Sequence, residues 1–448
     1  MKPNVKKTVF IFLTVVVILS SMAAVTFALG IPFPGGILPG RQVNIAAVQA
    51  PSPSPTPTWT IQDKIAEATA LLQGVTLKVG TKDISYKETR ITVSASNGVI
   101  MSSKSFKEPE KEIALAVLNT QTGEIKSVVI DKKGADLIAP QGWGIAILDR
   151  PNGIRWNGRN TAYRIDWPEN YVVIANVYPS DHKVTVAQKN KGKTVYVTKQ
   201  TIDYDVYTPY SPDIHSQDLV RAGSDYTAGV VAQAFADLRR KGVMSRAVGS
   251  TLIADVFASR SYFFQRIPLL EQTDQTEFFL SPQNTVERVQ VIIGANQDRA
   301  FEHTCNSSSA CGWLQFTDNA SVKNGKKYPG TYSAIVRDYP AAALIKDFTA
   351  GARDHVNSME AAILLYDENL KGLISSNGSG VLDDPKLEEY LAASYNGKPQ
   401  HAYQALHAAI LAGIGDWIDG LSAAKGGLKS ETQGYMMKLR YLQQNNLL

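Results

Sequence analysis

The sequence predicts an α+β chain of several domains: an N-terminal membrane segment, a mostly β middle domain and an all-α C-terminal domain. Three observations predict this order. A long uncharged run follows N-terminal lysines, apolar residues alternate with a period of two before residue 207, and apolar residues follow a helical period after residue 216. The length of 448 residues suffices for roughly three domains and at least one substantial core.

The composition narrows the classes of function. The chain is 44% hydrophobic and 19% charged, which excludes wholesale disorder and a multi-span membrane protein. Its net charge of +5 is too small and too dispersed to predict a nucleic-acid surface, so we expect no nucleic-acid partner. A mildly basic surface still favours anionic cell-wall polymers as partners.

The N-terminus predicts export. Three lysines within the first seven residues precede an uncharged stretch from Thr8 past Phe33. Residues 1–35 are therefore interpreted as a signal peptide, or as an uncleaved signal-anchor in the membrane. Positive charge before the apolar run predicts that the remaining chain is delivered outside the cytoplasm. We expect it to be membrane-anchored and facing the wall, or secreted or periplasmic if the signal is cleaved.

Residues 36–74 are interpreted as a linker that ends in a short helix. The segment PSPSPTPT at residues 51–58 has the composition of an extended spacer without a packed core. An amphipathic stretch from Ile61 to Leu72 follows it and predicts the helix.

Residues 75–207 carry the pattern of a β-rich domain. Apolar residues alternate with polar ones, as at Ile113, Leu115 and Val117, and Asn-Gly and similar turn signals separate the alternating stretches. No function follows from this pattern. The domain is a candidate surface for cell-envelope protein partners.

From residue 216 to 448 the pattern predicts helices. The clearest helical period comprises Val356, Met359, Ile363, Tyr366 and Leu370. Another helix is expected from about Asn284 to Ala295, with Gly294 suited to its end.

One carboxylate in this half directly follows an apolar run. The residues Ile-Pro-Leu-Leu precede Glu271. A carboxyl group held against apolar walls has its neutral form favoured, which is what a general acid needs near neutral pH. A solvated residue at a helix end is the competing interpretation.

Two further segments have the composition of a sugar site. Gly312, Trp313, Gln315 and Phe316 belong to the motif Gly-Trp-Leu-Gln-Phe, in which aromatic faces and a neutral amide suit pyranose rings and their polar groups. Packing of both aromatic residues at a helix start would explain the motif equally well. The segment Ala-Ser-Tyr-Asn-Gly at residues 393–397 offers a phenol and an amide, although a helix cap is the ordinary explanation of Asn-Gly.

In combination, these segments resemble the catalytic domain of the SLT-type lytic transglycosylases. That family carries its acid in Glu-Ser-x-Phe, shapes its glycan cleft with Gly-Leu-Met-Gln or Gly-Leu-Trp-Gln-Phe, and places a Tyr and an Asn near the acid in Ala-Tyr-Asn-Ala-Gly. Glu271, residues 312–316, Tyr395 and Asn396 stand at those places. The resemblance covers residues 237–411 or so and implies a divergent member with a lysozyme-like helical domain.

The resemblance implies cleavage of the β-1,4 bond between N-acetylmuramic acid and N-acetylglucosamine in peptidoglycan, without a metal or cofactor. Glu271 would protonate the glycosidic oxygen and then take a proton from the sugar's 6-hydroxyl, whose attack closes a 1,6-anhydro ring. Tyr395 and Asn396 would orient the acid and the substrate's acetamido group. The remaining implied roles are sugar binding by Gly312, Trp313, Gln315 and Phe316, and bracing of the helices by Glu360.

Two features depart from the family pattern. The residues after Glu271 do not match Glu-Ser-x-Phe, and 40 residues separate Glu271 from Gly312, far more than is usual in the family. Glu302, only ten residues before Gly312, is the alternative acid. We favour Glu271, because its approach is apolar whereas the surroundings of Glu302 are polar.

Other interpretations stay open. Cys305 and Cys311 are expected to form a disulfide in an exported chain, with free thiols as the alternative. Glu277 leaves room for a lysozyme-like hydrolase, since a second carboxylate could activate water. A non-catalytic, membrane-tethered protein that holds glycan or assists assembly is the third possibility. The histidines show no His-Glu-x-x-His arrangement, so no metalloprotease is predicted.

Overall fold

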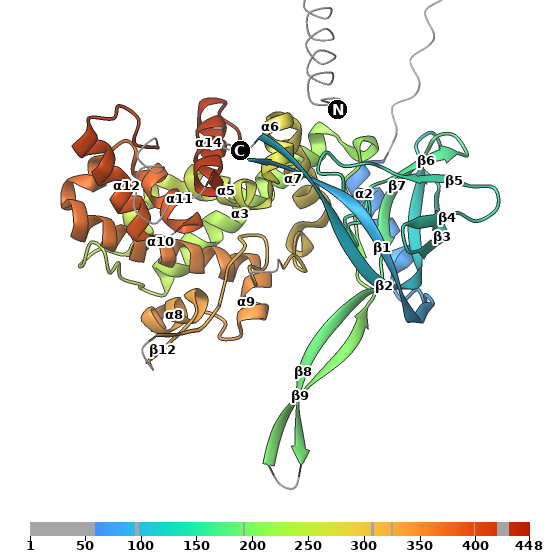
Figure 1. The fold of residues 1–448 in the computed structure, drawn as a ribbon, viewed down its shortest axis with the longest axis horizontal. Helices are drawn as coiled ribbons and strands as arrows, with labels where there is room; N and C mark the ends of the chain where they lie inside the picture. The colour runs from blue at the N-terminus through green and yellow to red at the C-terminus, as the bar shows by residue number, and fades with distance from the viewer. Residues whose placement is uncertain are drawn as a thin grey trace, which may run out of the picture. The chain divides into compact units, whose positions relative to one another are not determined.

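The computed structural model describes residues 59–448, apart from 95–97, 191–192, 306–308, 324–325, 398 and 419–429. The described residues belong to one compact unit, Pro57–Leu448. The long strands end by Tyr207 and the long helices begin at Gln217, so the α+β class with a β-rich middle and a mostly helical C-terminal region is confirmed (Figure 1). Within these residues no helix combines the length and hydropathy needed to cross a bilayer. The predicted membrane segment at 1–35 lies outside them.

The short helix predicted after the spacer is α2 (Ile61–Leu72). It begins with a capping box, in which the Thr60 side chain accepts from the backbone N–H of Asp63 and the Asp63 carboxylate accepts from the backbone N–H of Thr60. Its buried residues recur every three to four positions and pack on the sheet described next: Ile65, Ala68 and Leu72.

A six-stranded antiparallel sheet forms the β-rich region. Its order is β10-β7-β2-β3-β4, and β1 also pairs with β2. The strands are β1 (Val79–Ser94), β2 (Gly98–Asn119), β3 (Ile125–Lys133), β4 (Asp136–Ile138), β7 (Tyr171–Val177) and β10 (Val206–Tyr207). Two separate ribbons pair β5 (Gly144–Ile147) with β6 (Tyr163–Trp167), and β8 (Ser180–Asn190) with β9 (Lys193–Asp203).

The C-terminal part of strand β2, residues 113–118, is buried on both faces, which explains its apolar run. Ile113, Leu115 and Val117 point into one core together with Ile147 and Tyr163 of the β5–β6 ribbon. Their neighbours in the chain point into a second core, which also contains residues of α2 and of two helices of the C-terminal region. The β-rich and helical regions therefore share apolar packing.

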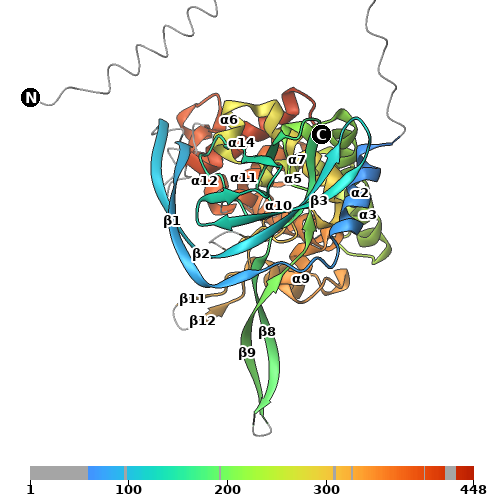
Figure 2. The same ribbon diagram turned by 90° about the vertical axis from the view of Figure 1, so that its right-hand side faces the viewer.

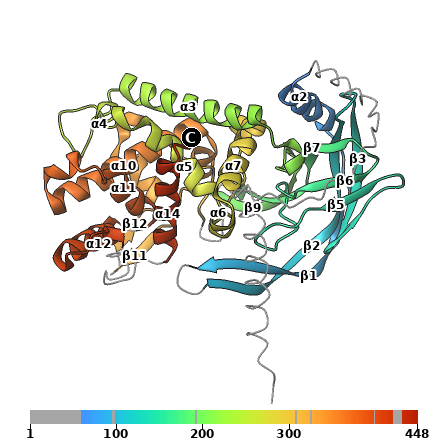
Figure 3. The same ribbon diagram turned by 90° about the horizontal axis from the view of Figure 1, so that it is seen from above.

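The β1–β2 ribbon extends beyond the sheet. Its two strands stay in register from Asp83, opposite Pro109, to Ser94, opposite Gly98. Figure 3 shows the ribbon reaching from the sheet to helix α6 (Gln275–Leu280). A second ribbon, β8–β9, projects away from both regions (Figure 2).

The helical region is built around α10 (His355–Asn377), whose residues Met359, Ile363, Tyr366 and Leu370 have no exposed surface. The predicted helical period is thus confirmed there. The other helices are α3 (Gln217–Arg240), α4 (Ile253–Val256), α5 (Ser261–Gln272), α7 (Pro282–Asn296), α8 (Thr331–Asp338), α9 (Phe348–Arg353), α11 (Leu387–Asn396), α12 (Pro399–Ala412) and α14 (Ser430–Gln444). A small ribbon pairs β11 (Ser321–Lys323) with β12 (Lys326–Tyr328).

The helix expected between Asn284 and Ala295 is α7, but Gly294 does not end it. Gly294 lies where α7 crosses α3, and a Cβ atom there would come within 2.2 Å of the Leu219 carbonyl oxygen. Gly223 on α3 faces α7 equally closely, since its Cβ would meet the Gln290 carbonyl oxygen at 2.0 Å. The expectation for Gly294 was wrong because the missing side chain serves close helix packing.

Candidate functional site

The segments singled out in the sequence meet at one pocket of about 630 Å³, which we call the Glu271 pocket. Glu271 lines it from the last turn of α5, and Gln315 and Phe316 line it from the Gly-Trp-Leu-Gln-Phe motif. Tyr395 and Asn396 line it from the end of α11. The fold therefore brings together side chains that are far apart in the sequence.

Glu271 has the surroundings of a group that is easily protonated. It directly follows the buried residues Leu269 and Leu270, and its side chain is partly exposed in the pocket. Burial raises the pKa of Glu271 to about 7, although a hydrogen bond from Tyr435 and the charge of Lys438 both act to lower it. A carboxyl group with this pKa holds its proton over much of the neutral range and can also release it.

Tyr435 on α14 is the hydrogen-bond partner of Glu271. Its hydroxyl donates to Glu271 Oε1 over 2.6 Å, and its side chain is almost fully buried. This bond fixes one carboxyl oxygen and leaves Oε2 without a hydrogen bond from any described residue. The free oxygen is the one suited to carry the acidic proton.

Lys438, one helical turn after Tyr435, holds the end of α5. Its ammonium group donates to the carbonyl oxygens of Leu270 (2.6 Å) and Thr273 (3.0 Å) and to Thr273 Oγ1 (3.1 Å). Burial lowers the pKa of Lys438 to about 8, while the charge of Glu271 acts to raise it. Lys438 thereby positions the turn that carries Glu271.

The sequence reasoning missed Tyr435 and Lys438. Both lie beyond residue 411, where the family resemblance stops. The sequence did contain a local signal. Tyr435 and Lys438 are three positions apart, so they lie on one face of a helix, and each is followed by a residue that is buried, Met436 and Leu439.

Tyr395 joins α11 to the sugar-site motif. Its ring stacks on Tyr366 of α10, with centroids 5.2 Å apart, and its hydroxyl donates to the Leu314 carbonyl oxygen over 2.7 Å. The tyrosine whose hydroxyl donates to Glu271 is therefore Tyr435, whereas the resemblance implied that Tyr395 has this role.

Asn396 keeps hydrogen-bonding capacity for a ligand. Its Oδ1 accepts from Thr432 Oγ1 over 2.9 Å. Its amide nitrogen has no hydrogen-bond partner in the described part of the chain. An amide N–H at the pocket surface suits the carbonyl oxygen of an acetamido group.

Gly312 and Gln315 fix the backbone of the motif that forms one wall of the pocket. Gly312 has φ +73°, and a Cβ atom there would meet the Ala352 carbonyl oxygen at 2.0 Å. Gln315 Nε2 donates to the Gly312 carbonyl oxygen (2.8 Å) and to that of Thr304 (3.2 Å). Gln272, next to the acid, also donates to the Gly312 carbonyl oxygen (3.0 Å). The motif is thus tied to the helix that bears Glu271.

The expectation that Trp313 contacts sugar was wrong for this conformation. The residue has no exposed surface, its ring stacks on His355 with centroids 4.3 Å apart, and its Nε1 donates to Ser358 Oγ over 2.6 Å. Trp313 anchors the motif in the helical core, and neither Trp313 nor Gly312 lines the pocket. Phe316 is also buried, with its ring packed edge-on against Tyr332 and Tyr395, so both aromatic residues of the motif pack in the core although Phe316 borders the pocket.

The alternative acid, Glu302, lies elsewhere. It lines a different pocket of about 590 Å³, which shares no lining residue with the Glu271 pocket. Its Oε2 is 3.7 Å from His303 Nε2. The structure therefore separates Glu302 from Gln315, Tyr395 and Asn396.

Two other carboxylates have structural partners. Glu360 on α10 is buried and accepts from the Lys241 ammonium group at 2.7 and 2.8 Å, which joins α10 to the end of α3 without reaching the pocket. Glu277 is also buried, between Arg288 and Arg150, and its Oε1 lies 2.9 Å from Arg150 Nη2. Glu277 does not line the pocket, so it is poorly placed to activate water there.

Cys305 and Cys311 form the predicted disulfide. The loop that it closes leads directly into the sugar-site motif. The backbone N–H of Cys311 donates to the Phe316 carbonyl oxygen over 2.8 Å, and that of Gly312 donates to the Thr304 carbonyl oxygen over 3.0 Å. The disulfide and these bonds together fix the entry to the motif.

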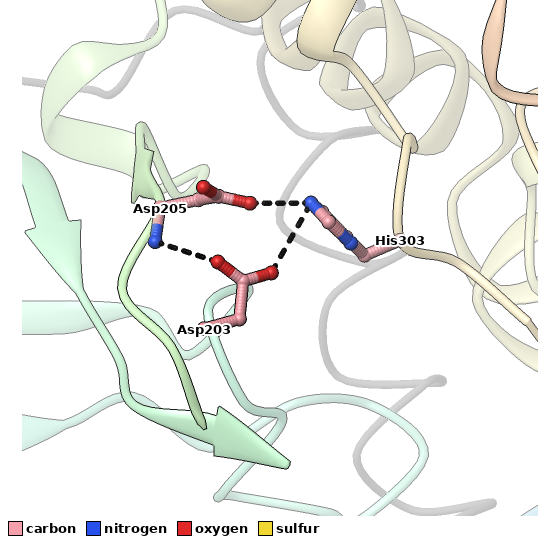
Figure 4. Close-up of side chains that lie close together, drawn as sticks. All are labelled: Asp203, Asp205 and His303. Atoms are coloured by element: carbon pink, nitrogen blue, oxygen red, sulfur yellow. Dashed lines mark hydrogen bonds and ion pairs between the residues drawn. The ribbon is translucent and has the colours of Figure 1, made fainter. Parts of the chain in front are cut away.

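A cluster of Asp203, Asp205 and His303 has side chains of the kind that bind metal ions. His303 Nε2 lies 2.6 Å from Asp205 Oδ2 and 3.6 Å from Asp203 Oδ2 (Figure 4). The Arg159 guanidinium group also forms ion pairs with both carboxylates, at 3.3 Å each. Because Arg159 and His303 already contact both carboxylates, we interpret the cluster as an ion-pair network between the β-rich region and the loop before Cys305.

Comparisons of the chain with known protein families, with curated proteins and with solved structures found no match. The functional interpretation therefore depends on the chemistry of the Glu271 pocket and on the sequence motifs that line it.

Proposed function

We propose that the chain is a peptidoglycan lytic transglycosylase in which Glu271 is the single general acid and base. The observation that carries the proposal is the placement of Glu271, partly exposed in a pocket and with its pKa raised to about 7 by burial. Asn396 in the same pocket provides an amide N–H for sugar, whereas the Gln315 amide nitrogen already donates to two carbonyl oxygens and leaves its side-chain oxygen for a ligand. The helical region would then be a lysozyme-like domain, exported to meet its substrate in the cell wall.

In the proposed reaction, Glu271 protonates the oxygen between N-acetylmuramic acid and N-acetylglucosamine while an oxocarbenium-like centre develops. The ionised Glu271 then accepts the proton of the 6-hydroxyl of the N-acetylmuramic acid. The oxygen of that hydroxyl attacks the anomeric carbon of the same residue and closes the 1,6-anhydro ring. Because the attack is intramolecular, no positioned water is needed. The hydrogen bond from Tyr435 stabilises the ionised form between the two steps.

Hydrolysis is the second candidate, because Asp274 and Glu431 also line the pocket. Asp274 Oδ1 already caps α6 by accepting the backbone N–H groups of Thr276 (2.9 Å) and Glu277 (3.1 Å). Glu431 is exposed, and its charge contributes to the raised pKa of Glu271. Glu431 is therefore the carboxylate that would activate water in a muramidase.

The products distinguish the candidates. The full chain is incubated with purified peptidoglycan, and the released muropeptides are identified by mass spectrometry. Anhydro-muropeptides support the proposal, whereas new reducing ends would identify a hydrolase. Sedimentation with the wall and no products would identify a glycan-binding protein. The variant Glu431→Gln is the matched control. It should abolish hydrolysis but keep the release of anhydro product, although loss of the neighbouring negative charge lowers the pKa of Glu271.

A further inference from the structure

Arg90 reaches the Glu271 pocket from the β-rich region. It belongs to β1, in the strand pair that extends to α6 (Figure 3). Arg90 is among the residues that line the pocket. The ribbon is held there at two points. The backbone N–H of Val93 donates to Thr276 Oγ1 over 3.1 Å, and that of Ile91 donates to the Asn152 carbonyl oxygen over 2.8 Å. The backbone on the C-terminal side of Arg90 is therefore held in place by two hydrogen bonds, which fixes the position from which its side chain extends.

The guanidinium group of Arg90 is available to a ligand. The residue is exposed, and no described residue forms an ion pair or hydrogen bond with its side chain. Lys438, the other described cation at the pocket, is buried and already donates to three oxygen atoms. Arg90 is therefore the exposed positive charge that an entering substrate meets.

We propose that Arg90 forms a binding site for a carboxylate carried by the glycan strand, an inference that rests on the proposed function. Guanidinium groups bind carboxylates in a two-pronged geometry, with charge-assisted hydrogen bonds. Each muramic acid unit carries such a group, either as the free lactyl carboxylate of a strand without peptides or on the stem peptide. N-acetylglucosamine carries none. Arg90 thereby sets which sugar occupies the site beside Glu271.

The test compares Arg90→Gln with Lys87→Gln. Lys87 is an exposed cation of the same strand, three positions earlier and hence on the opposite face, and it does not line the pocket. Turnover is measured on peptide-bearing strands and on strands stripped of peptide. We expect Arg90→Gln to lower kcat/KM by roughly tenfold, mainly through KM, and Lys87→Gln to change it little. A loss on one substrate alone identifies the stem or the lactyl group as the carboxylate.

A binding measurement separates this inference from the proposed reaction. Glu271→Gln and Glu271→Gln/Arg90→Gln are compared for binding to both strand types and to a hexamer of N-acetylglucosamine. We expect Arg90→Gln to weaken binding of the strands only, and Arg90→Lys to restore part of it. That result supports the Arg90 site even if the wild-type chain releases no anhydro products. Equal weakening for the uncharged hexamer, or no weakening for either strand type, would overturn the site.

Discussion

The variant Tyr435→Phe tests how the protein sets the acidity of Glu271. The substitution removes the hydroxyl that donates to Glu271 Oε1 over 2.6 Å and keeps the buried ring. That hydrogen bond favours the ionised carboxylate, so its loss must raise the pKa of Glu271. The general acid is active when protonated. The proposed reaction predicts that kcat/KM of the wild type falls as the pH rises through about 7, and that it falls at a higher pH in the variant.

The size of the shift follows from the bond. A hydrogen bond to a charged group contributes about 1.5–3 kcal/mol, and one pKa unit corresponds to about 1.4 kcal/mol. Because Glu271 is partly exposed in the pocket, solvent replaces some of this loss, and we expect a shift of about one unit. At pH 8 the protonated fraction would then rise from about one tenth to about one half.

The assay is the pH profile of kcat/KM on peptidoglycan strands between pH 5 and 9, with anhydro product as the readout. Tyr441→Phe is the matched control. Tyr441 lies on the same helix as Tyr435, and its ring packs on Phe278. Its phenol hydroxyl forms no hydrogen bond with any described residue, so the substitution removes a hydroxyl without breaking such a bond. The control should keep the wild-type profile. If the alkaline limb of Tyr435→Phe stays in place or moves to lower pH, Glu271 does not donate the proton that limits the reaction.

Two other outcomes are expected. Lys438→Met should raise the pKa of Glu271, because it removes a neighbouring positive charge. It should also lower the free energy of unfolding by about 2 kcal/mol, because the carbonyl oxygens of Leu270 and Thr273 lose their hydrogen-bond donor. Denaturant unfolding at pH 7 measures the second effect, and unchanged stability would contradict the positioning role. Excess chelator should leave both product release and the thermal midpoint unchanged, since Arg159 already forms ion pairs with both Asp203 and Asp205. A lowered midpoint would instead identify a structural metal at His303.

Local patterns predicted the parts of the fold that local physics controls. The helical period around Met359 and Tyr366 marked a helix that is buried on nearly every side. The apolar run before Glu271 correctly indicated a carboxyl group beside apolar walls.

Features that depend on distant packing could not be predicted in this way. Arg90 comes to the pocket because a long strand pair crosses from the sheet to α6, and nothing near Arg90 in the sequence encodes that crossing. The burial of the Trp313 ring depends on Ser358 and His355, which lie on α10, more than 40 residues later in the chain. Gly294 was interpreted as a helix end because glycine is common there. Its real role, close packing against the backbone of α3, depends on Leu219, which lies far away in the sequence.

The comparison of Glu271→Gln with Glu302→Gln tests the central claim most directly. Both variants replace a carboxylate with an amide of similar size, but only Glu271 lines the pocket that also contains Tyr395 and Asn396. The measurement is the initial rate of anhydro-muropeptide release from purified peptidoglycan. We predict a loss of at least about a hundredfold for Glu271→Gln and little change for Glu302→Gln. Full activity of Glu271→Gln, or a loss in Glu302→Gln alone, would contradict the assignment.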